Sequence, residues 1–252
     1  VGSGYTPFDT AAITRWATNN FGGKLSNLTL NMKTGSRIFI AQDVGMNLSD
    51  TTGSTISGVT GASINPLGDY KTFMLYLSEL KINQDVNLDN ATDAYNQLEI
   101  SNSRIINENT KTITGTQANQ VAMAQENNAT LYARNKVTLS NEGTINLSGT
   151  GSTGMYAKFG ELYNKATGVM AIGDQSTAIY GIDDSLIENA GKIMLGSNST
   201  GLYSDGSTTQ AIKNTGTIET AGNDSVAISY KPAAALAAGV VLENAGTITM
   251  TG

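Results

Sequence analysis

The stretch that decides the fold is SNEGTINLSGTGSTGMYA, residues 140–157. It is rich in Gly, Ser, Thr and Asn, and the apolar residues Ile145, Leu147 and Met155 are set apart between them. Such a composition is typical of flexible linkers when it stands alone. If the same pattern returns at a fixed period, however, the stretch is one unit of a repeat.

The pattern does return through the second half of the chain. An apolar-x-Asn-x-Gly-x-Ile phrase reads LSNEGTI at 139–145, IENAGKI at 187–193, IKNTGTI at 212–218 and LENAGTI at 242–248, and LYNKATGVM at 162–170 carries two extra residues. A second phrase follows in each unit: STGMY at 152–156, STAIY at 176–180, STGLY at 199–203 and SVAIS at 225–229. A worn copy lies upstream, with NTKTI at 109–113 and QVAMA at 120–124. The opening stretch is therefore one unit of an array.

The period and the patterning indicate short strands. The asparagines at 141, 164, 189, 214 and 244 are 23, 25, 25 and 30 residues apart. Apolar residues alternate with polar ones at Ile145/Leu147 and Ile193/Leu195, which is the period of a strand with one buried face. Three short strands and their turns fill such a unit, whereas a propeller blade needs about 40 residues. The sequence predicts an all-β fold, a right-handed parallel β-helix with coils of about 23–30 residues.

The repeated Asn and Gly residues have a physical explanation in this fold. Neighbouring coils lie about 4.8 Å apart, so equivalent side chains form ladders. We expect a structural ladder in which each Asn amide hydrogen-bonds the next, formed by Asn141, Asn164, Asn189, Asn214 and Asn244. The glycines two residues further on, Gly143, Gly191, Gly216 and Gly246, are expected to supply backbone angles that other residues resist.

The chain divides into three parts by regularity. Residues 1–24 are expected to cap the solenoid with a short helix whose core includes Trp16, the single tryptophan. Residues 25–104 are interpreted as irregular coils with a Gly/Ser-rich excursion at 50–69, and residues 105–252 as regular coils of one continuous solenoid. The connections between units vary in length, and the longest, at 231–241, is either a short surface helix or a tolerated insertion.

Composition excludes several classes of function. The chain has no Cys and no His, which removes thiol and imidazole catalysis and zinc or copper sites built on those residues. A net charge of −6 argues against nucleic acid and anionic lipid as partners. No apolar run approaches the roughly 20 residues needed to cross a bilayer, and the chain opens without a signal peptide, which we expect to have been removed or left out. We expect no cofactor.

Two acidic patterns resemble parts of known sites, a calcium loop and a catalytic carboxylate pair. Asp85, Asn87, Asp89 and Asp93 resemble the start of a calcium loop, but Asn90 and Asn96 stand where Gly and Glu are needed, so we expect no metal there. Asp183 and Asp184 are the one adjacent acidic pair, and paired carboxylates can hydrolyse glycosides. Because they lie in a variable connection, a solvated turn is the simpler interpretation, and no catalytic residue is assigned.

The tyrosines of the second phrase are the candidate binding residues. Tyr156, Tyr180 and Tyr203 hold one motif position, 24 and 23 residues apart, so they are expected to stack and to face outward over three coils. The core positions of these strands are expected one and three residues before the tyrosine position. They are Met155, Ile179, Leu202 and Ile228, and Thr153, Thr177, Thr200 and Val226. The small residues Gly154, Ala178 and Gly201 are expected beside the tyrosines. Either the rings receive a sugar or a receptor side chain, or the ladder only stabilises the coil edge.

The two phrases, apolar-x-Asn-x-Gly-x-Ile and Ser-Thr-Gly-apolar-Tyr, in coils of this length, resemble those of large type V autotransporter passengers, and are most similar to fusobacterial outer-membrane adhesins. That resemblance implies a monomeric segment, the N-terminal part of a longer passenger, displayed outside the cell and tethered to the outer membrane by a C-terminal β-barrel. It implies adhesion to host cells or other bacteria through a protein or glycan receptor. A structural spacer that presents a distal binding region and a polysaccharide-cleaving enzyme remain as alternatives.

Overall fold

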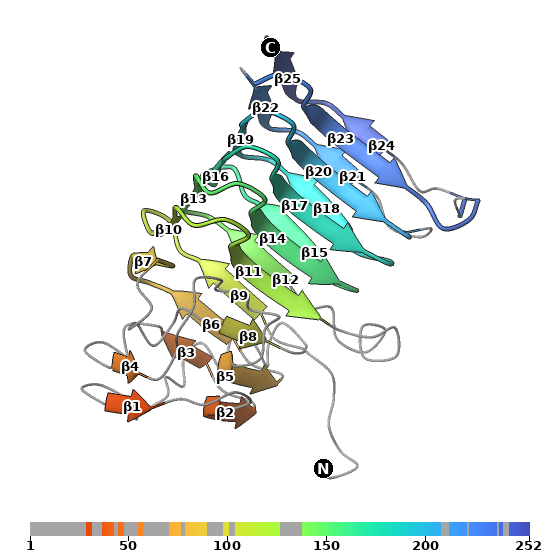
Figure 1. Cartoon of the computed structure of the whole chain (residues 1–252). Helices are drawn as coiled ribbons and strands as arrows, with labels where there is room; N and C mark the ends of the chain where they lie inside the picture. The colour runs from red at the N-terminus through yellow and green to blue at the C-terminus, as the bar shows by residue number, and fades with distance from the viewer. Residues whose placement is uncertain are drawn as a thin grey trace.

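The computed structural model describes residues 81–89, 104–126, 138–207, 212–220, 222–235, 237–238 and 242–252, together with seven further or overlapping strands in the N-terminal part. Those strands are β1 (Thr29–Asn31), β2 (Arg37–Gln42), β3 (Gly45–Asn47), β4 (Thr55–Ser57), β5 (Lys71–Tyr76), β6 (Glu79–Ile82) and β8 (Leu98–Ile100). The described residues contain strands and turns with no helix, and every strand pair is parallel (Figure 1). None of them forms a helix that is long and apolar enough to cross a membrane.

Five complete coils rise one above the other toward the C-terminal end, each made of three strands (Figure 1). The coils are β9 (Arg104–Asn107), β10 (Thr112–Gly115) and β11 (Val121–Glu126); β12 (Thr138–Asn141), β13 (Thr144–Leu147) and β14 (Thr153–Lys158); β15 (Glu161–Asn164), β16 (Val169–Ile172) and β17 (Thr177–Ile182); β18 (Leu186–Asn189), β19 (Lys192–Leu195) and β20 (Thr200–Asp205); and β21 (Ile212–Asn214), β22 (Thr217–Thr220) and β23 (Val226–Lys231). A last pair, β24 (Leu242–Asn244) and β25 (Thr247–Met250), lies on top. The expected parallel β-helix is confirmed.

Equivalent strands of successive coils form three parallel sheets. The Asn sheet is β3-β6-β9-β12-β15-β18-β21-β24, the Ile sheet is β7-β10-β13-β16-β19-β22-β25 with β7 at Val86–Asn87, and the Tyr sheet is β2-β5-β8-β11-β14-β17-β20-β23. Strands of the irregular N-terminal part thus extend the same three sheets. The expected cap at 1–24, with Trp16, lies outside the described residues, as does most of the excursion at 50–69, where β4 pairs with β1.

The described part of the connection at 231–241 contains bends and a turn with no helix. The alternative of a short surface helix is therefore wrong for these residues. A helix of a few residues is unfavourable in water, since its first turn fixes several residues for a single hydrogen bond. Nothing buries an apolar face here, because residues 231–235 are exposed.

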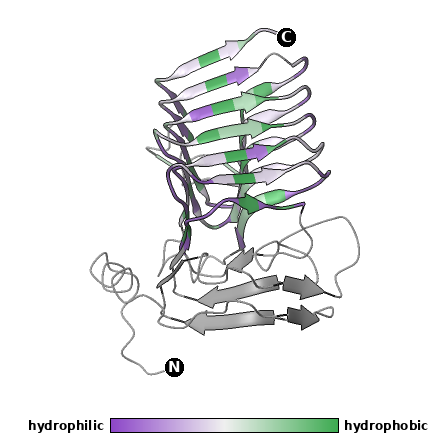
Figure 2. Cartoon of the chain, turned by 90° about the vertical axis from the view of Figure 1, so that its left-hand side faces the viewer, coloured by the Kyte–Doolittle hydropathy of each residue, from purple (hydrophilic) through white to green (hydrophobic). Residues whose placement is uncertain are grey.

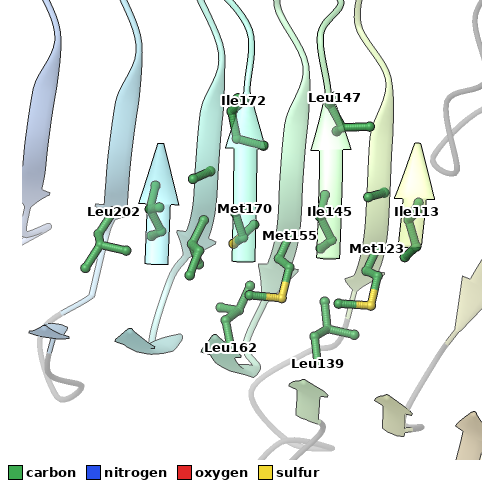
Figure 3. Close-up of a cluster of buried hydrophobic side chains, with 14 of the residues drawn as sticks. Ile113, Met123, Leu139, Ile145, Leu147, Met155, Leu162, Met170, Ile172 and Leu202 are labelled. Atoms are coloured by element: carbon green, nitrogen blue, oxygen red, sulfur yellow. The ribbon is translucent and has the colours of Figure 1, made fainter. Parts of the chain in front are cut away.

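The inward residues of the three sheets stack in rows to form one narrow core (Figures 2 and 3). On the Ile sheet, the row Ile113, Ile145, Met170, Ile193 and Ile218 is paired in register, and each member is no more than 1% exposed. The Asn sheet contributes the row Ile105, Leu139, Leu162, Ile187 and Ile212, and the Tyr sheet contributes Met123, Met155, Ile179 and Leu202. The period-two interpretation of the sequence is confirmed for the first two sheets.

The Tyr sheet departs from that alternation at the start of each strand. Ala178 and Ile179 are adjacent, and both are fully buried in the core. A Cβ added to Gly154 would collide with Met170 Cε, so this position also points inward. Thr153, Thr177 and Thr200 are only half-buried and lie outside the core cluster. The assignment of the threonines to the core, and of the small residues to the face beside the tyrosines, is therefore wrong. The strand pairing is interrupted here, since the register passes from Thr177 directly to Ile179 and leaves out Ala178.

An asparagine ladder ties the coils together where the Asn sheet turns into the Ile sheet. Each side-chain Nδ2 donates to Oδ1 of the next asparagine, at 2.9 Å from Asn141 to Asn164, 2.8 Å from Asn164 to Asn189, and 2.7 Å both from Asn189 to Asn214 and from Asn214 to Asn244. All but Asn244 are at most 1% exposed. The ladder predicted from the sequence is confirmed in register and in position.

The ladder also includes Asn107, which was not predicted from the sequence. Asn107 Nδ2 donates to Asn141 Oδ1 at 2.8 Å. Its signal is IINENTKTI at 105–113, which is the long form of the phrase seen in LYNKATGVM. Below it the register position is Ile82, and Asn107 Oδ1 accepts no hydrogen bond from the residues that the structure describes. The ladder therefore begins at Asn107.

The glycines after the ladder are explained by space instead of backbone angle. None of Gly143, Gly191, Gly216 and Gly246 takes the left-handed conformation, so the expectation about backbone angles is wrong. A Cβ at Gly216 would collide with Gly191 O, and one at Gly246 would collide with Gly216 O. Backbone of successive coils approaches too closely at this corner for any side chain.

Most left-handed residues instead mark the other two corners, while Thr110 lies in the turn between β9 and β10. One precedes each start of the Tyr sheet, at Asn119, Gly151, Gln175, Asn198 and Asp224, and one follows its end, at Phe159, Asp183 and Gly206. After the first set, a serine ladder forms: Ser152 N donates to Ser176 Oγ at 2.9 Å, and Ser176 N donates to Ser199 Oγ at 3.1 Å. This assigns a role to the recurring Ser of the second phrase, because its hydroxyl satisfies a buried N–H of the coil before it.

Replacing Ile193 by Asp should destabilise the solenoid by several kcal/mol, about 3–5, because a charge would be buried without a partner. Ile193 is fully buried between Met170 and Ile218 in its row. Met194→Asn, at the next residue but on the opposite face, and Lys213→Ala on the surface are the controls, and both should stay within about 1 kcal/mol. Thermal and urea unfolding measure the change. An unmoved transition in Ile193→Asp would contradict the inward assignment.

Asn189→Asp should make stability depend on pH. The new carboxylate would accept from Asn164 Nδ2 but would face Asn214 Oδ1, which is an acceptor. Burial and this repulsion raise its pKa in the folded state, so the loss is small below the unfolded value of about 4 and grows as pH rises through the raised value.

Asn189→Ala provides the control for that variant. It removes the ladder partner of both Asn164 and Asn214, at a cost of about 1–3 kcal/mol for each group, but it introduces no titrating group. Unfolding measured at pH 4 and pH 7 should therefore differ more for Asn189→Asp than for Asn189→Ala. Equal pH dependence in the two variants would contradict the direction of the ladder.

Candidate binding surface

The three motif tyrosines stack on the outer face of the Tyr sheet. Tyr156 pairs in register with Tyr180, and Tyr180 with Tyr203. The first two rings meet edge to face with centroids 5.6 Å apart, and the second two are tilted by 34° with centroids 4.9 Å apart. Met155 and Ala157, on either side of Tyr156, are fully buried, so the tyrosine between them points outward. The predicted tyrosine ladder is confirmed.

The rings differ in how far they are exposed. Tyr156 is only 9% exposed, whereas Tyr180 and Tyr203 are half-buried. Beyond Tyr203 the register position is occupied by Ser229, whose side chain is much smaller. A ligand can therefore reach the rings of Tyr180 and Tyr203. The expectation that all three rings are exposed is wrong for Tyr156.

A charged pair lies beside Tyr203. The Tyr203 hydroxyl donates to Asp205 Oδ2 at 3.3 Å, and Lys231 Nζ approaches the same oxygen at 3.2 Å. The side chain of Asp205 is 30% exposed and that of Lys231 is 70% exposed. We call Tyr180, Tyr203, Asp205 and Lys231 the tyrosine–aspartate site. Asp205 and Lys231 were not predicted from the sequence; their signal is their position two residues after Tyr203 and Ser229 on adjacent strands.

Two groups of this site have shifted pKa values. Burial raises the pKa of the Tyr180 hydroxyl, and the nearby Tyr203 and Asp205 raise it further. The hydrogen bond and charge of Asp205 raise the pKa of the Lys231 ammonium. Both shifts favour the protonated form, so Tyr180 stays neutral and Lys231 stays charged beside Asp205.

A similar group on the Asn sheet provides a comparison. The Tyr163 hydroxyl donates to Glu161 Oε2 at 3.0 Å, which repeats the tyrosine–carboxylate contact over the same two-residue spacing. Here, however, Lys165 Nζ lies over the ring at 4.0 Å from its centroid. One ring face of Tyr163 is therefore occupied by a side chain of the protein itself.

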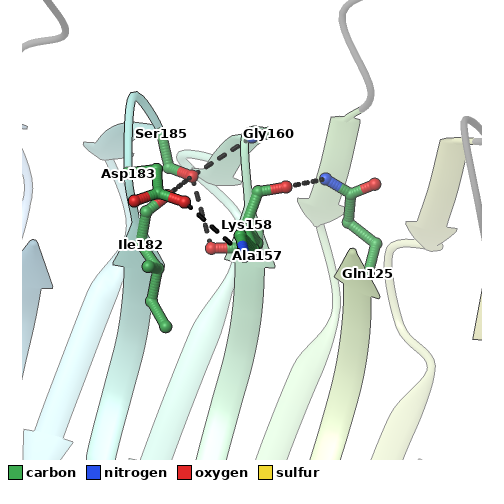
Figure 4. Close-up of polar contacts among 7 residues, drawn as sticks. All are labelled: Gln125, Ala157, Lys158, Gly160, Ile182, Asp183 and Ser185. Atoms are coloured by element: carbon green, nitrogen blue, oxygen red, sulfur yellow. Dashed lines mark hydrogen bonds and ion pairs between the residues drawn. The ribbon is translucent and has the colours of Figure 1, made fainter. Parts of the chain in front are cut away.

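The adjacent acids Asp183 and Asp184 follow the end of β17 at Ile182, and Figure 4 shows Asp183 at this corner. Asp183 is left-handed, its backbone N donates to Asp205 O at 2.7 Å, and its carboxylate is 3.8 Å from Lys158 Nζ. Next to it, Ser185 Oγ donates to Ile182 O at 2.8 Å and to Ala157 O at 3.2 Å, and accepts from Gly160 N at 3.1 Å. Asp183 thus takes part in the turn that joins two coils.

The acidic pattern at the lower end has a structural use. Asp85 Oδ1 accepts from Thr112 N at 2.9 Å, and Asn87 Oδ1 accepts from Asp89 N at 2.9 Å. Asp89 accepts from Thr116 N and from Gln120 Nε2, both at 2.9 Å with Oδ1, and its pKa is lowered by these hydrogen bonds although its partial burial opposes them. Asp93 lies outside the described residues. Asp85 and Asp89 thus accept hydrogen bonds from the coil above.

A shallow groove of about 350 Å³ lies on the outer side of the Ile sheet. Its lining includes Asn146, Ala171 and Met194, which form one outward row, and Asp174 at the corner. Asp174 Oδ1 accepts from Ser197 N at 2.8 Å. The groove forms because Ala171 is shorter than its two neighbours.

Alkaline titration should show that Tyr180 ionises above the ordinary tyrosine value of about 10, since burial favours the neutral phenol. Because the folded-state pKa is raised, the contribution of Tyr180 to stability is complete below the unfolded value and is lost as pH rises through the folded value. Tyr180→Phe should remove that part of the alkaline loss. Difference absorbance near 295 nm and unfolding curves, compared with Tyr163→Phe, measure both effects, and identical curves for the two variants would contradict the shift.

Comparison with known proteins identifies the family of this chain. Neither a curated protein nor a solved structure matches this chain. A family model described as the BigA third pectate lyase-like domain matches residues 29–252, which include all the described coils. The family is associated with surface-exposed bacterial proteins, and its pectate lyase-like description refers to a β-helix. With the match covering most of its length, the chain belongs to the BigA third pectate lyase-like domain family.

Proposed function

We propose that this chain is a segment of a bacterial surface passenger that mediates adhesion to host cells or other bacteria. The observation that carries the proposal is the half-exposed pair Tyr180 and Tyr203, held in register by the coils and flanked by Asp205 and Lys231. Tyrosine supplies a large contact area with a polar end, which suits contact surfaces. The family assignment supports display at the bacterial surface. Tethering by a C-terminal outer-membrane barrel, and a monomeric state, are parts of this proposal.

A structural spacer is the second candidate, and a specific observation favours it. The asparagine ladder continues through every described coil from Asn107 to Asn244. Because each coil contacts mainly its neighbours, such an array resists bending and can hold a distal region away from its anchor. A spacer needs no surface site, so the tyrosine ladder would then only stabilise the coil edge.

The proposal also holds that the chain is not an enzyme. Asp183 is 3.8 Å from Lys158, and its left-handed backbone belongs to a turn between coils. A reducing-end assay after incubation with polygalacturonate and with neutral polysaccharides tests this directly. Release of new reducing ends that Asp183→Asn abolishes would overturn it.

Replacing both Tyr180 and Tyr203 by Ser should reduce adhesion by about tenfold or more, because the loss of a central aromatic contact typically costs at least 1.4 kcal/mol. The measurement counts host cells or bacteria bound to beads coated with the whole chain. Tyr156 is left intact because it is nearly buried, and its replacement would test the fold.

Tyr163→Ser, on the neighbouring sheet, is the matched control and should leave adhesion unchanged. Melting curves verify that each variant keeps its fold. Equal adhesion by the double variant and the unchanged chain would contradict the assignment of the site. A chain that binds no cell at all would favour the spacer.

A further inference from the structure

We propose that the tyrosine–aspartate site binds a neutral glycan, a sugar that carries hydroxyl groups and no carboxylate. This inference rests on the proposed function and specifies the ligand class of the same surface. Three features of the site carry it: an aromatic ring with a small neighbour on one side, a carboxylate oxygen without a partner, and a balanced charge.

The ring of Tyr203 has room on the side that faces the next coil. Tyr180 lies at 4.9 Å on one side of it, while Ser229 holds the next register position on the other side. A serine is several atoms shorter than a tyrosine, so the ladder ends in a step of about one strand spacing, 4.8 Å. The apolar face of a pyranose ring can lie on an aromatic ring placed in this way.

Polar groups at the edge of the step match sugar hydroxyls. Asp205 Oδ2 accepts from Tyr203 and Lys231, whereas Asp205 Oδ1 accepts no hydrogen bond from any residue that the structure describes. Lys231 Nζ has three donors and uses one of them on Asp205. A free carboxylate oxygen beside free ammonium donors can accept from one hydroxyl and donate to the next.

The charges around the site favour a neutral ligand over an acidic one. Asp205 and Lys231 cancel, and the neighbouring Lys158 is 3.8 Å from Asp183. Two further lysines are paired in the same way, Lys192 with Glu219 at 2.8 Å and Lys213 with Glu243 at 3.6 Å, while Lys165 lies over the Tyr163 ring. With a whole-chain charge of −6, these described coils offer no net attraction for a polyuronate or a sialylated glycan.

The described surface is less suited to a protein partner. Protein interfaces are built around a desolvated core of large apolar and aromatic side chains. Among the described residues, the exposed large hydrophobic side chains are Val226, Leu242, Ile248 and Met250, which belong to the last strands, β23–β25. On the coils below, the outward face of the Tyr sheet presents two tyrosines and a charged pair. This area matches the size of one or two sugar units better than that of a protein interface.

The experiment titrates the whole chain with neutral oligosaccharides such as lactose, N-acetyllactosamine and cellobiose, and with oligogalacturonate and sialyllactose as acidic counterparts. Calorimetry or a glycan array gives the affinities. We expect binding to at least one neutral sugar and at least tenfold weaker binding to the acidic sugars. A preference for an acidic sugar would overturn the inference.

Two pairs of matched variants locate the site. Asp205→Asn and Tyr203→Ala should each weaken binding by about tenfold, equivalent to about 1.4 kcal/mol, since each removes one polar or one stacking contact. Glu161→Gln and Tyr163→Ala change the similar group whose ring is covered by Lys165, and should change affinity less than twofold. Equal effects in the two pairs would overturn the assignment to this site.

A separate arm distinguishes this inference from the function on which it rests. Host cells or bacteria are treated with glycosidases that remove neutral glycans, and then with protease, before adhesion to the coated beads is counted. Loss of adhesion after glycosidase supports the neutral glycan. Adhesion that survives glycosidase and is lost to protease overturns it and leaves the adhesive function in place. No adhesion to untreated cells overturns both.

Discussion

Everything in this structure depends on the register between successive coils, and the asparagine ladder is the interaction that sets it. A buried amide has two donors and an acceptor that must be satisfied. Asn164 meets this demand by accepting from Asn141 and donating to Asn189. A coil shifted by one residue would leave these groups unpaired and would turn its Ile row toward solvent. The ladder therefore couples the register of the backbone to the burial of the core.

The other corners use different devices for the same purpose. At the start of the Tyr sheet, a left-handed residue such as Gln175 precedes a serine that caps an N–H of the previous coil. At its end, Asp183 and Gly206 take the left-handed conformation, and their backbone N–H groups donate to the coil above. Left-handed residues other than glycine cost about 1–3 kcal/mol, which the repeated inter-coil hydrogen bonds offset.

This rigid register is what makes a surface site possible. Tyr180 and Tyr203 are brought together because their strands pair residue for residue, and Asp205 and Lys231 meet because the same pairing continues two positions further on. Such a site can be formed by single substitutions on an outward position without disturbing the core. The tyrosine ladder breaks at Ser229 in this way, and the break leaves room beside Tyr203.

The sequence by itself determined the repeat, the strand period, the asparagine ladder and the stacking of the tyrosines, because equivalent residues in a solenoid must superpose whatever the details of the turns. Asn107 was missed since its phrase has Lys111 in place of the glycine, and the threonines were misplaced since two adjacent residues of each strand, such as Ala178 and Ile179, face the core. The role of the glycines, the burial of Tyr156 and the approach of Lys231 to Asp205 were decided by the tertiary structure alone. These depend on distances between coils and on side-chain direction, which no spacing along one chain contains.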